Sequence, residues 1–236
     1  MPEPNEHLPS IDSPAVQALL VVLSFVAGAT DVISFLGLDG LFTAHITGNL
    51  VILAAHIVIG DPATLAPMLS VPVFIIVIIL TKMLAGRLES GGVATLRPLM
   101  ILQFVLLAGF LALCIVAGPG INPNATNAII AGMLGVSAMA VQNALVQFSL
   151  RGAPSTAAMT SNVTRFAMDL GELWSPNSPA AAAEARKNVI RILPVIIGFA
   201  AGCAIGGVAE ASFGMRALAL PTALALLACG LTFSAG

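Results

Sequence analysis

The sequence predicts an all-α integral membrane protein, with about six transmembrane helices and two polar, broken or re-entrant helical segments in two homologous repeats. Three observations indicate this class. Hydrophobic residues make up 58% of the chain and charged residues only 8%, whereas soluble domains carry about 25% charged residues. Several apolar runs reach the roughly 20 residues that a helix needs to cross a hydrocarbon core. Two similar Thr-rich segments interrupt these runs.

The chain begins with an acidic, proline-rich stretch over residues 1–14, which predicts a disordered tail. This stretch lacks the positive n-region of a signal peptide, so we expect the first apolar run to be retained as a helix. The six predicted crossings are Ala15–Leu36, Met68–Leu88, Pro98–Ala117, Asn127–Leu150, Val189–Ala209 and Ala217–Ala235. They form one membrane domain, with repeat 1 over residues 15–118 and repeat 2 over residues 119–236.

The repeat is clearest in the two polar segments. TAHITGNLVILAAH begins at Thr43, after the first crossing, and TAAMTSNVTRFAMD begins 113 positions later at Thr156, after the fourth. Four positions are identical in the two segments: Thr43, Ala44, Thr47 and Asn49 are matched by Thr156, Ala157, Thr160 and Asn162. Beyond the segments, Asp31 aligns with Asn143.

The distribution of positive residues decides whether the polar segments cross the membrane. If neither crosses, eight of the nine Lys and Arg residues face one side and only Arg216 faces the other. If both cross, the same residues divide at best six to three. Positive residues collect on the cytoplasmic side. We therefore expect six crossings, both termini in the cytoplasm, and a second repeat that is inverted relative to the first.

A re-entrant segment must pair its backbone groups inside the hydrocarbon layer, and a short helix after a break does so. We expect Gly48 to permit the first break and Thr47 or Asn49 to cap the helix that follows. Ser161 and Asn162 offer the same chemistry in the second segment. Two such half-helices bring partly positive N-terminal ends toward the membrane centre, which suits an anionic or dipolar solute.

Asp31 lies inside a predicted crossing, where an acid is costly unless it is paired, hydrated or protonated. We interpret it as a proton-coupling or cation-coupling group or a substrate ligand, with a hydrated or helix-bonding acid as the alternative. His45 lines the same cavity in this interpretation, or packs as a hydrogen-bonded histidine. It lies eleven positions from His56, too far for both to hold one metal ion on a helix, so we expect no metal site.

The candidate substrate or ion site joins polar residues of both repeats. Its members are Asp31, Thr43, His45, Thr47, Asn49, Gln142, Asn143, Thr156, Thr160 and Asn162. Arg165 and Asp169 lie one helical turn apart and form either a solvated cytoplasmic face or a gate. Gly198, Gly202 and Gly206 recur every four residues, which lets another helix approach closely, within the monomer or in a homo-oligomer.

Two quoted stretches carry a resemblance to a known family. GATDVISFLGLDGLFTAHITGNLV in the first half and QNALVQFSLRGAPSTAAMTSNVTR in the second resemble the YoaK-type family of uncharacterised bacterial inner-membrane proteins, a domain-of-unknown-function family. With the surrounding helices, the resemblance covers nearly the whole chain after the first dozen residues. It implies a compact multi-pass protein of the bacterial inner (cytoplasmic) membrane and supplies no substrate.

Enzyme chemistry is not expected. The sequence has no HExxH motif, no second intramembrane Asp to pair with Asp31, and no Ser–His pair placed by helical spacing. We expect no cofactor and no nucleic-acid partner, since the net charge is −2 without a basic patch. The partners expected are the lipid bilayer and a small-molecule or ion substrate.

The function that these observations favour is a secondary transporter of a small polar or anionic solute, bound between the two Thr/Asn-rich segments near the membrane midplane. Two alternatives stay open. One is a channel for a small solute, which needs only a continuous polar path. The other is a non-transporting membrane scaffold or sensor, which needs no polar interior.

Overall fold

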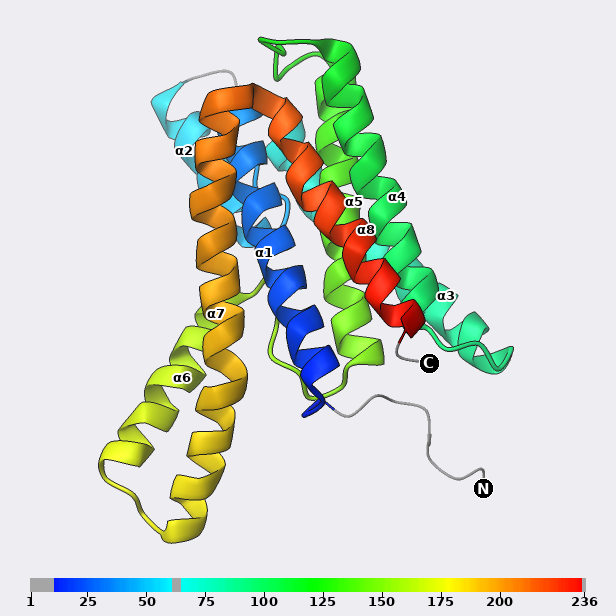
Figure 1. The fold of residues 1–236 in the computed structure, drawn as a ribbon. Coiled ribbons are helices and arrows are strands. Elements are labelled where there is room, and N and C mark those ends of the chain that lie inside the picture. The colour runs from blue at the N-terminus through cyan, green and yellow to red at the C-terminus, as the bar shows by residue number, and fades with distance from the viewer. Residues whose placement is uncertain (1–10, 61–64, 235–236) are drawn as a thin grey trace.

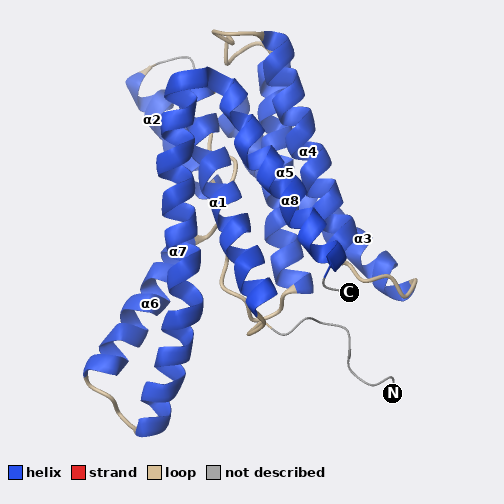
Figure 2. Ribbon diagram, viewed as in Figure 1, coloured by secondary structure: helices blue, strands red, loops and turns tan. Residues whose placement is uncertain are grey.

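The computed structural model describes residues 11–60 and 65–234, and the side chains up to residue 230. Every regular element in these ranges is a helix (Figures 1 and 2). In chain order the elements are α1 (Pro14–Gly37), α2 (Ile46–Ile59), α3 (Leu65–Ser90), α4 (Leu96–Ala117), α5 (Thr126–Ser149), α6 (Met159–Trp174), α7 (Pro179–Phe213), the 3₁₀ turn η1 (Gly214–Leu218) and α8 (Ala219–Ser234). The all-α prediction is confirmed. The tail expected over residues 1–14 falls largely outside the described residues.

Within residues 11–60 and 65–234, five helical stretches are long and apolar enough to cross a membrane. Four are α1, α3, α4 and α5. The fifth, Pro179–Gly230, joins α7, η1 and most of α8, and Figure 1 shows that the chain reverses direction at η1. The protein is therefore a multi-pass helical membrane protein, as the composition predicts.

The helix α7 starts ten residues earlier than Val189, where the sequence predicts the crossing to begin. Its N-cap is Ser178, whose hydroxyl accepts a hydrogen bond from the Ala181 N–H, and Pro179 occupies the first turn. The following residues are mainly alanine, the strongest helix former. The apolar crossing consequently continues outward as a polar helix, which pairs with α6 to form a hairpin at the lower end of Figure 1.

The closest helix pair is α1 with α7, and glycines permit it. A Cβ on Gly202 would lie 2.3 Å from the Phe25 carbonyl oxygen, and a Cβ on Gly28 would lie 2.3 Å from the Phe199 carbonyl oxygen. Gly198 and Gly206 are buried on the same face of α7 and also meet α1. The sequence predicts close helix packing at Gly198, Gly202 and Gly206, either within the monomer or in a homo-oligomer. In the structure all three glycines pack against α1 of the same chain.

The remaining contacts close the bundle. Among the described helices, α3 and α4 pack on α5, and α8 packs on α1 and α4. The short helix α2 packs on α3, and the short helix α6 packs on α7. Figure 1 places the start of α1, the ends of α3 and α5 and the α6–α7 hairpin at one end of the bundle. The elements and loops at this end carry Lys82, Arg87, Arg97, Arg151, Arg165, Arg186, Lys187 and Arg191, whereas Arg216 lies in η1 at the other end.

Candidate functional site

The first non-helical break covers residues 38–45, between α1 and α2. Asp39 and Gly40 turn the chain with positive φ angles of 52° and 83°. From α1, Asp31 reaches the end of the break: its Oδ1 accepts hydrogen bonds from the backbone N–H groups of Thr43 at 2.7 Å, Ala44 at 2.8 Å and His45 at 3.4 Å. The carboxylate therefore holds the backbone that leads into α2, a role that a capping side chain on α2 itself would otherwise take.

The second oxygen of Asp31 has a different environment. The Thr43 hydroxyl lies 3.4 Å from Oδ1 as well, so every hydrogen bond that the Asp31 carboxylate accepts within the described chain goes to this one oxygen. The side chain is only 4% exposed. The two oxygens of the Asp31 carboxylate therefore differ. Oδ1 accepts several hydrogen bonds, whereas Oδ2 receives no donor from the described residues.

Asn49 stabilises the other side of the first break. Its side chain accepts from the Phe42 N–H at 2.9 Å, donates to the Phe42 carbonyl at 2.7 Å and donates to the Ser70 hydroxyl of α3 at 2.8 Å. The predicted break at Gly48 is wrong, because α2 begins at Ile46 and already contains both Gly48 and Asn49. Gly48 instead makes room for Phe42, whose ring carbon would lie 2.8 Å from a Cβ at this position.

The second break, residues 150–158, lies between α5 and α6. Here Ser155 supplies the acceptor: its Oγ accepts from the N–H groups of Ala158 at 2.8 Å and Ala157 at 3.3 Å. Asn162 donates to the Ser155 carbonyl at 2.7 Å. This bond repeats the one from Asn49 to Phe42, since both asparagines reach a carbonyl seven residues earlier. Capping by Ser161 or Asn162 is wrong, because α6 begins at Met159 and includes both.

Gln142 of α5 connects the second break to the bundle core. Its Nε2 donates to the Leu23 carbonyl of α1 and to the Thr156 hydroxyl, each at 2.9 Å. Its Oε1 accepts from Gln103 of α4 at 2.7 Å. All three polar side chains are buried. This network therefore joins three long helices to the break in the middle of the bundle.

The other predicted residues are more scattered. Asn143, the sequence counterpart of Asp31, donates to the Met139 carbonyl of its own helix at 2.9 Å. Thr47 and Thr160 are exposed, each as the second residue of its helix, α2 and α6. The half-buried ring of His45 lies 5.9 Å from the Phe42 ring. The structure thus gathers Asp31, Thr43, His45 and Asn49 at the first break, and Gln142, Thr156 and Asn162 at the second.

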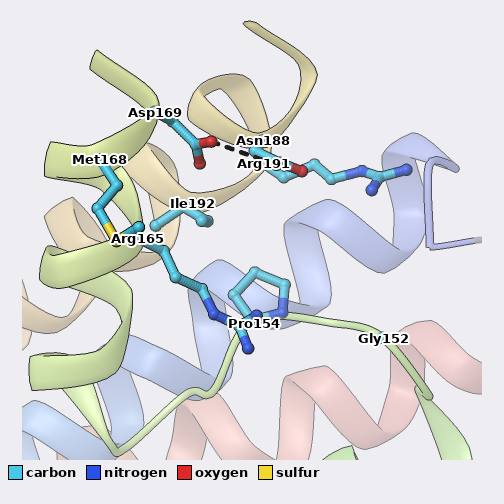
Figure 3. A pocket seen from close by; sticks show the side chains of 8 residues that line it. All are labelled: Gly152, Pro154, Arg165, Met168, Asp169, Asn188, Arg191 and Ile192. Atoms are coloured by element: carbon cyan, nitrogen blue, oxygen red, sulfur yellow. Dashed lines mark hydrogen bonds between the residues drawn. The ribbon is translucent and has the colours of Figure 1, made fainter. Parts of the chain in front are cut away.

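Arg165 and Asp169 line a cavity of about 290 Å³ between α6, α7 and the loop after α5. Figure 3 shows Asp169 directed toward Asn188 of α7, and the Asn188 Nδ2 lies 3.5 Å from its Oδ1. In the same view, Arg165 extends toward Pro154 in the second break. The predicted gate pair therefore lies where the second break meets the α6–α7 hairpin.

Sequence reasoning missed four polar residues: Ser24, Ser70, Gln103 and Ser155. Ser155 precedes Thr156 directly and could have been found as a Ser that can form an ST turn before a helix. Ser70 and Gln103 are recognisable only through their tertiary partners. The Ser24 hydroxyl is fully buried and has no hydrogen-bond partner in the described chain, whereas Thr30 on the same helix donates to the Val26 carbonyl.

Among the residues described, no three His, Cys, Asp or Glu side chains lie together as a metal ion would require. Neither the curated proteins nor the solved structures include a match to the chain. A protein-family model matches residues 19–231, nearly the entire membrane domain and both breaks. The chain therefore belongs to the family described as "Protein of unknown function (DUF1275)".

Proposed function

We propose that this protein is a secondary transporter of a small polar or anionic solute, which binds between the two breaks near the membrane midplane. One observation carries the proposal: two non-helical segments lie inside a membrane bundle, and each is held by buried side chains from the long helices. Irregular backbone at membrane depth is tolerated where it lines a cavity or is buried in protein, and transporters build solute sites from such segments.

Helix contacts support an internal repeat. Exchanging α1 with α5, α2 with α6, α3 with α7 and α4 with α8 converts each contact between long helices into another contact that is also present. The α1–α7 pair becomes α5–α3, the α4–α5 pair becomes α8–α1, and the α2–α3 pair becomes α6–α7. In Figure 1, α2 leads toward the end of the bundle opposite to that of α6. Both features favour two inverted copies of one four-helix unit.

Helix lengths support the re-entrant assignment of α2 and α6. At 1.5 Å per residue, the 14 residues of α2 extend about 21 Å and the 16 residues of α6 about 24 Å. A hydrocarbon core is about 30 Å thick. The breaks contact α1 at Leu23 and at Asp31, which lie about 12 Å apart along the helix. The proposed solute site lies between these two levels.

The chemistry of the two breaks differs, and this favours an ion-coupled carrier over a channel. At the first break, Asp31 presents an oxygen that no donor of the described residues reaches, and this oxygen suits a proton or a small cation. Ser155, a neutral group, caps the second break, so the partial positive charge at the start of α6 is available to an anionic or dipolar solute. Arg165 and Asp169 then act as a cytoplasmic gate beside this second break.

The proposal extends to the location of the protein and to its family designation. We assign the protein to a bacterial inner membrane and to the YoaK-type designation on the resemblance of its two polar segments. We assign it no enzymatic activity and no cofactor. A homo-oligomer would have to use surfaces other than the α7 glycine face, which α1 of the same chain occupies.

The test combines binding with transport. Purified protein is screened for thermal stabilisation by small acids, amines and neutral solutes, and each stabilising solute is then offered to proteoliposomes with and without a proton gradient. We expect Asp31→Asn to abolish gradient-driven uptake. Asp39→Asn is the matched control, because Asp39 is exposed in the same break and its positive φ suits Asn.

Each alternative predicts another result. Uptake by Asp31→Asn at the wild-type rate under a gradient would favour the channel. If no solute binds or crosses although the wild-type protein is folded, the scaffold or sensor is the better account.

A further inference from the structure

A second groove lies along the first part of α7, next to the cavity that Arg165 and Asp169 line. It has a volume of about 510 Å³ and runs between α7 and the segment that leads into α1. Asp12 and Gln17 form one wall. The other wall is a single face of α7, made by Ala183, Arg186, Lys187, Ile190, Arg191 and Pro194. These residues recur with helical spacing, so one stripe of α7 lines the groove along its length.

The mouth of the groove attracts anions. Three cations against one carboxylate leave its lining with a net charge of +2. Asp12 is paired with Arg191 and lies 3.5 Å from the Lys187 Nζ. Arg186 is exposed and makes no ion pair within the described chain. Lys187 and Arg191 therefore already contact the oxygens of one acid, Asp12, and Arg186 is available for the oxygens of another.

The floor of the groove is apolar and continues into the membrane. Ile190 is 62% exposed beside the cations, and Pro194 follows one turn later. Ile197, another turn along α7, is 58% exposed. A ligand that fits both parts has an oxyanion at one end and a hydrocarbon chain at the other. A free phosphate would use the mouth alone, whereas a phospholipid uses the entire stripe.

We propose that this groove binds the phosphate of an anionic phospholipid of the cytoplasmic leaflet, with an acyl chain along Ile190, Pro194 and Ile197. Arg186 and Lys187 hold the phosphate oxygens. Asp12 is an intramolecular competitor for Lys187 and Arg191. The proposal does not rest on the transport function, although Arg191 also lines the cavity that Gly152 and Pro154 of the second break share with Arg165 and Asp169.

Native mass spectrometry of the detergent-solubilised protein tests the site, with phosphatidylglycerol and phosphatidylcholine offered at equal concentration. Wild-type protein should retain phosphatidylglycerol preferentially. The Arg186→Gln, Lys187→Gln double variant should lose about tenfold in this preference, since each basic residue near an anionic headgroup adds substantially to binding. Arg87→Gln, an exposed arginine at the same end of the bundle, should retain it. Asp12→Asn should strengthen it.

Two further results would overturn the proposal. One is equal retention of the two lipids by wild-type protein. The other is complete displacement of phosphatidylglycerol by an equal concentration of glycerol phosphate, which would show a phosphate site without a lipid. Because the substituted residues are exposed, an unchanged helical circular dichroism spectrum and a cooperative thermal transition of each variant confirm that folding is intact.

Discussion

The two carboxylate oxygens of Asp31 have different roles: one holds the first break, and the other is available for the proposed ion coupling. Oδ1 accepts hydrogen bonds from the backbone N–H groups of Thr43, Ala44 and His45, and Oδ2 receives no donor from the described residues. An asparagine keeps an acceptor at the first position and removes the charge needed at the second. An alanine removes both. The two substitutions therefore distinguish the structural role of Asp31 from its proposed role in coupling.

The first prediction follows from this separation. Asp31→Ala leaves one buried and two partly buried backbone donors without this acceptor, and an unsatisfied buried group costs about 1–3 kcal/mol. We expect a loss of at least about 1–3 kcal/mol in the free energy of unfolding, whereas Asp31→Asn should lose much less. Thermal melting of both variants in the same detergent measures this. Equal melting temperatures for the two would mean that the carboxylate does not hold the break.

Asp12 provides a prediction about pH. The hydrogen bond from Arg191, with Lys187 nearby, lowers the pKa of the Asp12 carboxyl. A lowered pKa in the folded state means that the stabilisation is present at neutral pH and is lost as the pH falls through the range where Asp12 protonates. The melting temperature of Asp12→Asn should therefore approach that of the wild type in acid. A difference that stays constant from neutral to acid pH would contradict the pairing.

Among the helices, the α1–α7 contact is the most sensitive to a single methyl group. Gly202→Ala would place its Cβ 2.3 Å from the Phe25 carbonyl oxygen, so the helices must separate. Overpacking of this kind costs about 1–3 kcal/mol. Gly86 of α3 is the matched control, since a Cβ there meets nothing within 4 Å. Gly86→Ala should raise stability by about 0.5–1 kcal/mol, because alanine favours the helix.

The opposite signs of these two substitutions are the test, and thermal melting of the pair measures it. If Gly202→Ala were as stable as Gly86→Ala, the close approach of α1 and α7 would be wrong.

Helix positions were largely predictable, and break positions were not. Apolar run length places α1, α3, α4 and α5 within three residues at each end, because the membrane sets the length of a crossing. Apolar run length does not find the start of α7, because its first ten residues are too polar to belong to a crossing. They form a helix because alanine, which dominates them, has the highest helix propensity. The breaks were placed too late, at Gly48 and Ser161. Phe42, Asp31 and Ser155 decide these positions through contacts that no local pattern displays.

The candidate site was predictable in part for the same reason. Polar residue types in an apolar chain identify Asp31, Asn49, Gln142 and Asn162 directly. Which of them meet depends on tertiary packing: Gln142, rather than the aligned Asn143, turns toward the second break.

At the scale of the whole molecule, the arrangement predicts a definite orientation in the membrane. Eight of the nine Lys and Arg residues belong to one end of the bundle, which positive residues mark as cytoplasmic. A phosphatase reporter fused after Gly60 should therefore be active outside, and one fused after Ser178 should be inactive. Activity of the second fusion with none from the first would reverse the topology. A matching cytoplasmic reporter at both sites serves as the control for expression.

The central claim is that the two breaks line one solute site, and cysteine accessibility tests it most directly. In a chain without Cys114, Cys203 and Cys229, single cysteines replace Thr47 and Thr160, with Asn124 and Ser175 as loop controls. We expect a small hydrophilic thiol reagent to modify both cysteines, which stand at the starts of α2 and α6 directly after the breaks. A solute that stabilises the protein should slow both reactions and leave the loop controls unchanged. Complete protection of both cysteines, in proteins whose loop controls react, would show a sealed core and contradict the claim.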